Sequence, residues 1–133
     1  MPQTQRGVEV KISRPYLVDE AIVQYSLVVT GVDAAHIKKP TAQGVRALGV
    51  AMQEATAAGQ SIDVCVVGWI YVIDEAGTLN GGDPITTGSG AGAYHKAMLA
   101  ATGDYVAGYV EGDDAAAAAD LVLARIGIVD RIV

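Results

Sequence analysis

Alternation of apolar and polar positions is the strongest signal in this chain. Ile62, Val64 and Val66 alternate with Asp63 and Cys65, directly after a Gly-Gln turn. Side chains of a β-strand point to opposite faces of a sheet with a period of two residues. The pattern therefore predicts a half-buried strand that starts at this turn.

Short apolar segments of this kind recur along the chain, separated by residues that favour turns. The strongest turn signals are DEAG at 74–77 and NGGDP at 80–84. The chain has 16 glycines, one Trp, six Tyr and no Phe, so Val, Ile, Leu and Ala must fill the core. Short β-branched segments between glycines are typical of a mostly-β domain, and 133 residues are enough for one such domain.

The two halves of the chain resemble each other at an offset of 59 residues, which sets Gly49 on Gly108 and Gly68 on Gly127. The shared pattern is a strand with a central glycine, an Ala-rich connection, an alternating strand and another glycine. We therefore expect one β domain built from two related strand–connection–strand units. The connections should be short helical turns or loops, because about five alanines cannot sustain an isolated helix.

The N-terminal segment carries its own strand pattern, in which Val8, Val10 and Ile12 alternate with charged residues. No turn signal ties this segment to the next element. Residues 1–15 are therefore expected to form an extended arm before a single domain at 16–133. Such an arm is mobile until it pairs with the sheet edge of a partner. Pairing within its own domain stays open as the alternative.

Charge and composition exclude several functions. The net charge of −6 disfavours binding to a nucleic-acid backbone. Cys65 is the single cysteine, which excludes an intrachain disulfide, and its apolar strand predicts a buried, unreactive thiol. No apolar segment reaches the ~18 residues that cross a bilayer, and the polar N-terminus lacks the apolar centre of a signal peptide. We expect a chain made in a cytoplasm, without a membrane partner.

Residues that could carry chemistry are sparse. The GSGAG segment at 88–92 lacks the Lys-Ser/Thr pair of a phosphate loop, and His36 and His95 lack metal-ligand spacing. Acidic pairs occur at turns, where Asp normally accepts hydrogen bonds from nearby backbone: Asp19–Glu20, Asp74–Glu75 and Asp113–Asp114. The sequence thus predicts no catalytic residue, no metal site and no cofactor.

Two large aromatic residues stand out in a chain that has few. Trp69 and Tyr71 share one face if residues 66–73 are extended. Aromatic residues in such positions either fill a core or anchor an interface between subunits. Both interpretations stay open, so Trp69 and Tyr71 are candidate subunit-interface residues.

Three segments together carry a resemblance to a known family. They are LGVAMQEATAAGQSIDVCVVGWIYV, GGDPITTGSGAGAY and VAGYVEGDDAAAAADLVLARIG. Across residues 16–128 this pattern is similar to the head-decoration (capsid cement) proteins of tailed bacteriophages. The chain after Gly127 departs from the pattern, because its apolar residues continue as an additional strand.

The resemblance implies a small β-tulip or barrel-like domain that forms a trimer on the outer capsid surface of a virion. It also implies a non-enzymatic function, in which the protein binds the major capsid protein and stabilises the shell. The arm would pair with strands of that protein through Val8, Val10, Ile12 and Arg14.

Two functions of other classes remain as alternatives. The first is a surface β-sandwich that recognises a carbohydrate or a host receptor, with Trp69 and Tyr71, or Tyr94 and His95, as an aromatic platform. The second is a small hydrolase that uses the acidic pairs.

Overall fold

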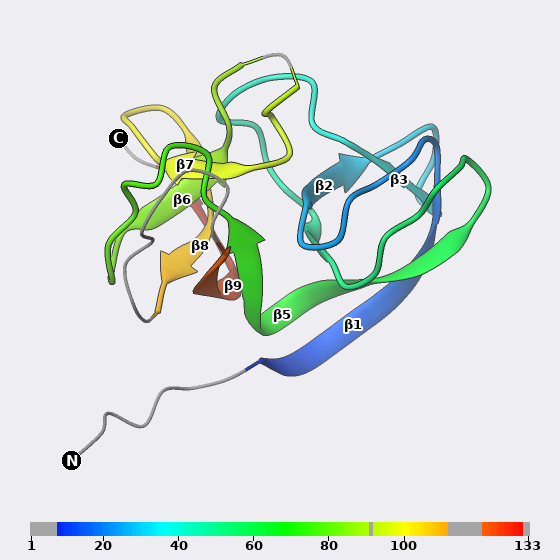
Figure 1. Ribbon diagram of the computed structural model, residues 1–133, viewed down its shortest axis with the longest axis horizontal. Coiled ribbons are helices and arrows are strands. Elements are labelled where there is room, and N and C mark those ends of the chain that lie inside the picture. Colours follow the sequence, from blue (N-terminus) through cyan, green and yellow to red (C-terminus); the bar gives the residue numbers. More distant parts are fainter. Residues whose placement is uncertain (1–7, 91, 112–120, 132–133) are drawn as a thin grey trace.

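The described residues form nine strands in one continuous sheet (Figure 1). The computed structural model describes residues 8–90, 92–111 and 121–131, and the side chains of the last segment as far as residue 127. The strands are β1 (Glu9–Val18), β2 (Leu27–Thr30), β3 (His36–Lys38), β4 (Gly49–Ala51), β5 (Ser61–Ile73), β6 (Pro84–Thr87), β7 (Ala97–Leu99), β8 (Tyr105–Val110) and β9 (Leu121–Arg131). No helix occurs in these segments, so the predicted mostly-β class is confirmed.

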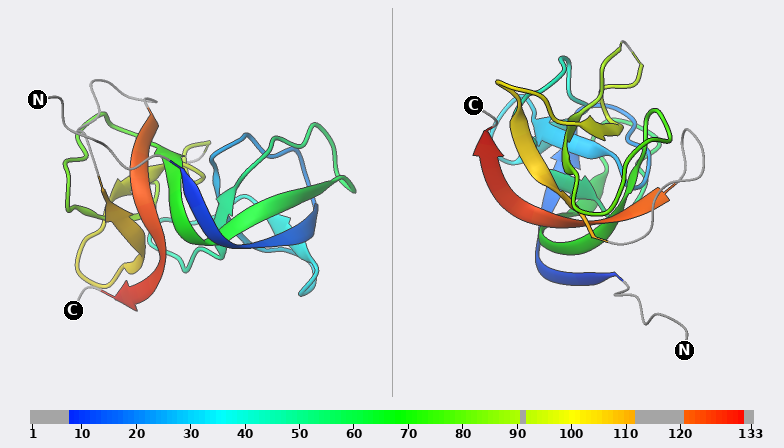
Figure 2. Two further views of the ribbon diagram at one scale, coloured as in Figure 1. Left: turned by 90° about the horizontal axis from the view of Figure 1, so that it is seen from below. Right: turned by 90° about the vertical axis from the view of Figure 1, so that its left-hand side faces the viewer.

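Two rings of strands share β5. Strand order β1-β3-β2-β4-β5, together with direct pairing of β1 and β5, closes the first ring. The second ring follows β5-β9-β8-β6-β7 and closes through a parallel bridge between Asp74 and Ala97. Figure 2 shows the result as two halves joined along the long strand β5.

The rings are related by the internal repeat that the sequence predicted. Outward from the β5–β9 contact, the strand order is β5-β4-β2-β3 in one direction and β9-β8-β6-β7 in the other. Gly68 pairs with Ile126, and the equivalent Gly127 lies against Val67 of β5. The two glycines therefore mark the centre of an approximate two-fold relation between the halves.

In each ring, a carboxylate that follows the first strand accepts a hydrogen bond from a backbone N–H. Asp19 follows β1 and accepts a hydrogen bond from the backbone N–H of Val32, at 2.8 Å. Glu75 follows β5 and accepts one from the N–H of Ser89, at 2.6 Å. In both cases the donor follows a glycine, Gly31 or Gly88, whose Cβ would collide with the carboxylate. Both acids therefore bind backbone, as predicted, but at positions 13 and 14 residues further along the chain and not in their own turns.

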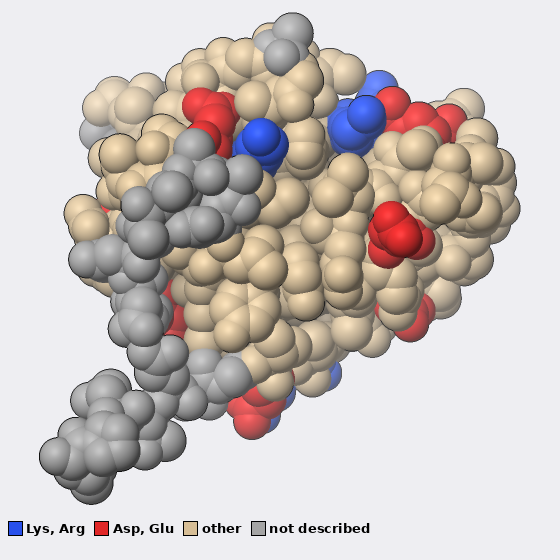
Figure 3. All heavy atoms as spheres, viewed as in Figure 1, with Lys and Arg blue, Asp and Glu red and all other residues tan. Residues whose placement is uncertain are grey.

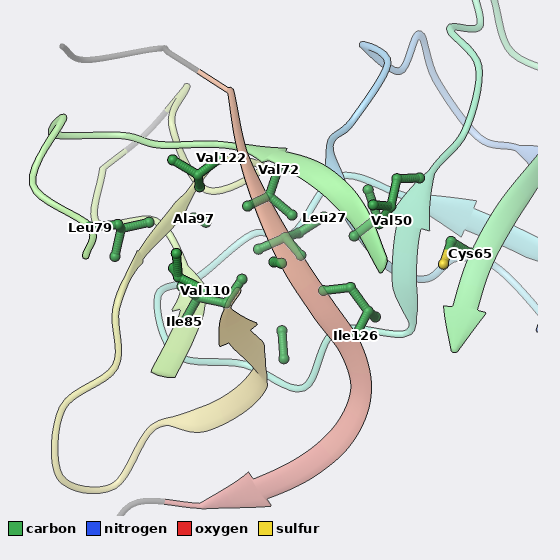
Figure 4. Close-up of a cluster of buried hydrophobic side chains, with 13 residues drawn as sticks. Leu27, Val50, Cys65, Val72, Leu79, Ile85, Ala97, Val110, Val122 and Ile126 are labelled. Carbon is green, nitrogen blue, oxygen red and sulfur yellow. The ribbon is translucent and has the colours of Figure 1, made fainter. Parts of the chain in front are cut away.

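Two apolar clusters fill the fold, one on each face of β2, β4 and β5. Leu27, Val50 and Cys65 pair across these strands and belong to the larger cluster, which extends into the second ring (Figure 4). The neighbouring residues belong to the smaller cluster inside the first ring: Val28, Ala51 and Val64. Cys65 is 0% exposed and burial raises the pKa of its thiol to about 11, which agrees with the predicted buried thiol.

Strand β1 corrects the expectation of an unpaired arm. Residues from Glu9 to Leu17 pair antiparallel with β5, and Leu17 and Val18 also pair parallel with β3. The alternative of pairing within its own domain therefore holds for these residues. The sequence missed it because the partner strand lies about fifty residues further on, far beyond the reach of a hairpin turn.

The first Ala-rich connection, residues 52–60, is a loop without a helix, and an isolated bridge joins Ala55 to Ile22. The second connection and the pair Asp113–Asp114 lie outside the described residues. After Gly127 the chain continues β9 as far as Arg131, so its last described residues extend an existing strand instead of forming a new one.

Candidate interaction surface

The outer face of the second ring carries a row of three large side chains. Trp69 of β5 pairs with Arg125 of β9, and Arg125 pairs with Tyr109 of β8. The next residues along these strands, Ile70, Ala124 and Val110, point into the core and are at most 2% exposed. Because adjacent side chains of a strand point in opposite directions, Trp69, Arg125 and Tyr109 point outward. We call these three residues the Trp69 row.

A hollow of about 290 Å³ lies beside the Trp69 row, at the point where β1, β5 and β9 meet. Its lining comprises Lys11, Val67, Gly68, Trp69, Arg125, Ile126 and Gly127. The two glycines lack side chains at this crossing, and both have positive φ angles, +143° and +107°. The repeat that relates the two halves therefore also creates the concave part of this surface.

The rim of the hollow is cationic and its floor is apolar. The ammonium of Lys11 lies 3.5 Å from the carboxylate of Glu9, and both side chains are about half-exposed. Arg125 is exposed and forms no ion pair with any residue that the structure describes. Trp, Tyr and Arg are the residue types that most often dominate binding energy at protein interfaces. The surface can therefore hold an apolar side chain flanked by carboxylates.

The predicted interface residues Trp69 and Tyr71 differ in their surroundings. Both are half-buried and lie on the same face of β5. The ring of Tyr71 packs edge-to-face on that of Tyr25, with 5.9 Å between centroids, whereas Trp69 lines the hollow. Tyr71 thus packs on another residue of the chain, whereas Trp69 borders the hollow and is the aromatic residue that a partner seated there would contact.

The predicted arm residues do not form the uniform row that their spacing suggested. A register shift sets Val10 opposite Gly68 and Ile12 opposite Val67, which are adjacent residues of β5. Val10 and Ile12 therefore lie on opposite faces, because a bulge reverses the alternation. Val10 packs against the larger core cluster, whereas Ile12 is 46% exposed.

The remaining arm residues stay accessible. Val8 is 50% exposed and Arg14 is exposed. Since Glu9 pairs with Trp69 and Ile12 with Val67, β1 lies directly beside the hollow. Of the predicted arm residues, Ile12 thus shares the face of Trp69, whereas Arg14 pairs with Val64 and lies on the opposite face of β5.

The outer edge of β1 is partly blocked by Pro15. The N–H of Leu17 donates to Ala35 of the neighbouring segment, and that of Val18 donates to Gln60 on the β5 side. By alternation, the nitrogen of Pro15 faces away from β5, where it carries no hydrogen to donate. Proline at this position hinders pairing with a further strand. Side chains of β1 are therefore better suited to contact a partner than its backbone edge is.

Sequence analysis missed Tyr109 and Arg125. Each is one residue in an alternating strand, and nothing in the local pattern separates them from other outward-facing residues. Only the registers of β5 with β9 and of β9 with β8 bring them beside Trp69. The offset of 59 residues does hint at β8 and β9 as a pair, but it does not supply this register.

The two acidic pairs that the structure describes, Asp19–Glu20 and Asp74–Glu75, bind backbone. Both oxygens of Asp74 accept backbone N–H groups, and Glu75 accepts the N–H and the hydroxyl of Ser89. Glu20 accepts the N–H of Lys39 at 3.0 Å. Within the described segments, His, Cys, Asp and Glu form no cluster of three or more that could hold a metal ion.

The two histidines should titrate on opposite sides of pH 6.5. Nδ1 of His36 lies 2.6 Å from Oδ1 of Asp33, and this hydrogen bond raises the pKa of His36. Burial lowers the pKa of His95, and Lys96 and Lys39 lower it further. An NMR pH titration of the imidazole carbons should resolve the two midpoints. The His36–Asp33 interaction stabilises the fold below pH ~6.5 and is lost as the pH rises through the raised pKa of His36.

The variant Asp33→Asn tests the cause of this difference. It should move the midpoint of His36 down and leave that of His95 unchanged, because the groups that shift the pKa of His95 are Lys96 and Lys39, not Asp33. Midpoints in the opposite order, or an Asp33→Asn protein in which His36 does not move, would contradict the assignment.

Comparison with known proteins supports the fold. No known protein family matches the sequence, and neither does any curated protein. Among solved structures, the chain is similar to the head fiber gp8.5 N base in bacteriophage phi29, with a TM-score of 0.65 and 19% sequence identity. The match covers 86% of this chain and 92% of that chain, so the two share their fold over nearly their whole length. None of the described segments forms a helix long and apolar enough to span a membrane.

Proposed function

We propose that this protein is a non-enzymatic structural component of a bacteriophage virion, which binds the outside of the capsid and stabilises the shell. The observation that carries the proposal is the fold shared with the head fiber gp8.5 N base of phage phi29 across most of both chains. The sequence resemblance to head-decoration proteins points to the same location. The described acidic pairs support a structural role, because their carboxylates hold loops in place.

The Trp69 row and the adjacent hollow form the docking surface in this proposal. Its partner is the major capsid protein, which inserts an apolar side chain beside Trp69 and places a carboxylate against Arg125. Exposed side chains of β1 on the same face, namely Lys11 and Ile12, extend the contact. The pairing of β1 with β5 holds these side chains in position before docking, which reduces the entropy lost on binding.

Assembly as a trimer would strengthen a modest contact. When one subunit of a trimer has docked at a lattice position, the other two subunits are already close to their own sites. Their contacts therefore form within one assembly, which raises the overall affinity. Much of the face seen in Figure 3 is uncharged, with isolated acidic and basic side chains, which favours packing between proteins. The protein contributes buried contacts to the seams of the shell, and no chemical step is required.

Binding to undecorated shells of the cognate phage tests the proposal. Trp69→Ala and Arg125→Glu should each weaken binding at least about tenfold, because truncated interface anchors typically cost 1–2 kcal/mol or more. Cosedimentation with purified shells measures the affinity, and electron microscopy of decorated particles shows whether the copies lie in threes. Wild-type protein should also raise the temperature at which the shells rupture.

Tyr94→Ala is the matched control, because Tyr94 is also a half-buried aromatic residue but does not line the hollow beside Trp69. It should bind shells like the wild type. Shell binding that survives both Trp69→Ala and Arg125→Glu would exclude this surface, and a wild-type protein that does not bind shells would overturn the proposed function.

A further inference from the structure

We propose that the seam between the two rings holds a binding site for a single neutral pyranose ring. A hollow of about 250 Å³ lies there, separate from the one beside Trp69. The first ring lines it with Glu20, Lys39, Pro40 and Thr41, and the second ring with Gly92, Tyr94 and His95. In Figure 1 the two loops that carry most of these residues approach each other above β2 and β6.

Hydrogen bonds hold the residues that line this hollow, on the side of each ring. On the first ring, the N–H of Lys39 donates to Oε2 of Glu20 at 3.0 Å, and the ammonium of Lys39 lies 3.8 Å from Oε1. On the second ring, the N–H of Leu27 donates to the carbonyl of His95 at 2.9 Å, and that of Gly88 donates to the carbonyl of Tyr94 at 3.2 Å. The site is therefore pre-formed, as ligand sites usually are.

The lining residues match the surface of a sugar ring. A pyranose has an apolar C–H face and a rim of hydroxyl groups that both donate and accept hydrogen bonds. Tyr94 and Pro40 supply apolar surface, and the phenol of Tyr94, the hydroxyl of Thr41 and the carboxylate of Glu20 supply polar atoms. The volume lies just below the range of roughly 300–1,000 Å³ typical of drug-sized ligands, which favours one ring over an oligosaccharide.

The charge of the hollow favours a neutral ligand. Glu20 is paired with Lys39, so these two lining residues offset each other. Burial, and then the charges of Lys96 and Lys39, keep the pKa of the His95 imidazole below its usual value, although the carboxylate of Glu20 lines the same hollow. His95 is therefore neutral at pH 7, where its ring offers one donor and one acceptor to sugar hydroxyls.

NMR titration of the full chain with simple glycosides tests the site. The probes are methyl β-D-glucopyranoside, methyl β-D-galactopyranoside and methyl N-acetyl-β-D-glucosaminide at pH 7.5. At least one should shift the ring resonances of Tyr94 and His95 saturably. Tyr94→Ala should weaken that binding at least about tenfold, because it removes the aromatic face of the site. Trp69→Ala should leave it unchanged, since Trp69 lines the other hollow.

The pH dependence gives a second readout. Affinity should fall as the pH drops through the lowered pKa of His95, because protonation of the imidazole removes the nitrogen that accepts a hydrogen bond from a sugar hydroxyl. The proposal is overturned if none of the glycosides moves the signals of His95, or if Tyr94→Ala binds like the wild type. Binding to a polysaccharide but to no free glycoside would also overturn it. Loss of shell binding plays no part in this test, so the two proposals can fail separately.

Discussion

Replacement of Asp74 by alanine should lower the free energy of unfolding by about 3 kcal/mol, because it leaves three backbone donors without their acceptor, one of them buried and two part-buried. Asp74 is 1% exposed. Its Oδ1 accepts the N–H groups of Ala76 and Gly77 at 3.1 and 3.0 Å, and its Oδ2 accepts that of Leu79 at 3.1 Å. Water cannot easily replace a carboxylate at this depth.

The position of Asp74 makes the loss larger than that of an ordinary turn residue. It directly follows β5, and its bridge to Ala97 closes the second ring. The turn that Asp74 holds also places Leu79, which is 1% exposed, in the larger core cluster. Loosening of this turn therefore weakens ring closure and core packing together.

Urea unfolding of the wild type, Asp74→Ala and Asp83→Ala measures the effect. Asp83 is the matched control, because it accepts only one backbone N–H in a turn of the same ring, from Asn80 at 2.8 Å. Its replacement should cost only about 1 kcal/mol. Equal losses for the two variants would show that the three hydrogen bonds of Asp74 do not stabilise the fold more than the single one of Asp83 does.

Replacement of Gly68 by alanine should also cost at least about 3 kcal/mol, or prevent folding, because it combines backbone strain with a clash that no side chain can relieve. A Cβ at Gly68 would lie 2.5 Å from the carbonyl oxygen of Glu9, 2.8 Å from the nitrogen of Lys11 and 2.9 Å from Cα of Val10. All three atoms belong to the backbone of β1. The variant must therefore push β1 away from β5 or unfold.

The variant Gly59→Ala distinguishes the two causes of the expected loss, backbone strain and the clash with the backbone of β1. Gly59 also has a positive φ, +88°, but nothing lies within 4 Å of a Cβ placed there. It should lose only the roughly 1 kcal/mol that backbone strain alone costs. Hydrogen exchange of the β1 amides should accelerate in Gly68→Ala and stay slow in Gly59→Ala. A Gly68→Ala protein with protected β1 amides and near-wild-type stability would disprove the close crossing of the two strands.

Short-range rules allowed much of the fold to be predicted from the sequence. Alternation around Val64 predicted β5, because a strand with one buried face must alternate. Acids at turns predicted the local backbone hydrogen bonds of Asp74, because Asp competes for nearby N–H groups whatever the fold. The hydrogen bond that Asp19 accepts from Val32, 13 residues away, did not follow from that rule. The repeat at an offset of 59 residues predicted two related units, because equivalent strands need glycines at equivalent crossings.

Tertiary structure alone decided which strands pair and in which register. The alternating pattern of β1 fits pairing with the sheet of a partner and pairing with β5 equally well. Only the folded chain shows that β1 pairs with β5. A bulge between Val10 and Ser13 then turns Ile12 to the opposite face, which no alternation rule can foresee. The Trp69 row depends in the same way on two registers between distant strands. Sequence patterns record which face of a strand is buried, whereas the neighbours on its exposed face follow from pairing over long distances in the chain.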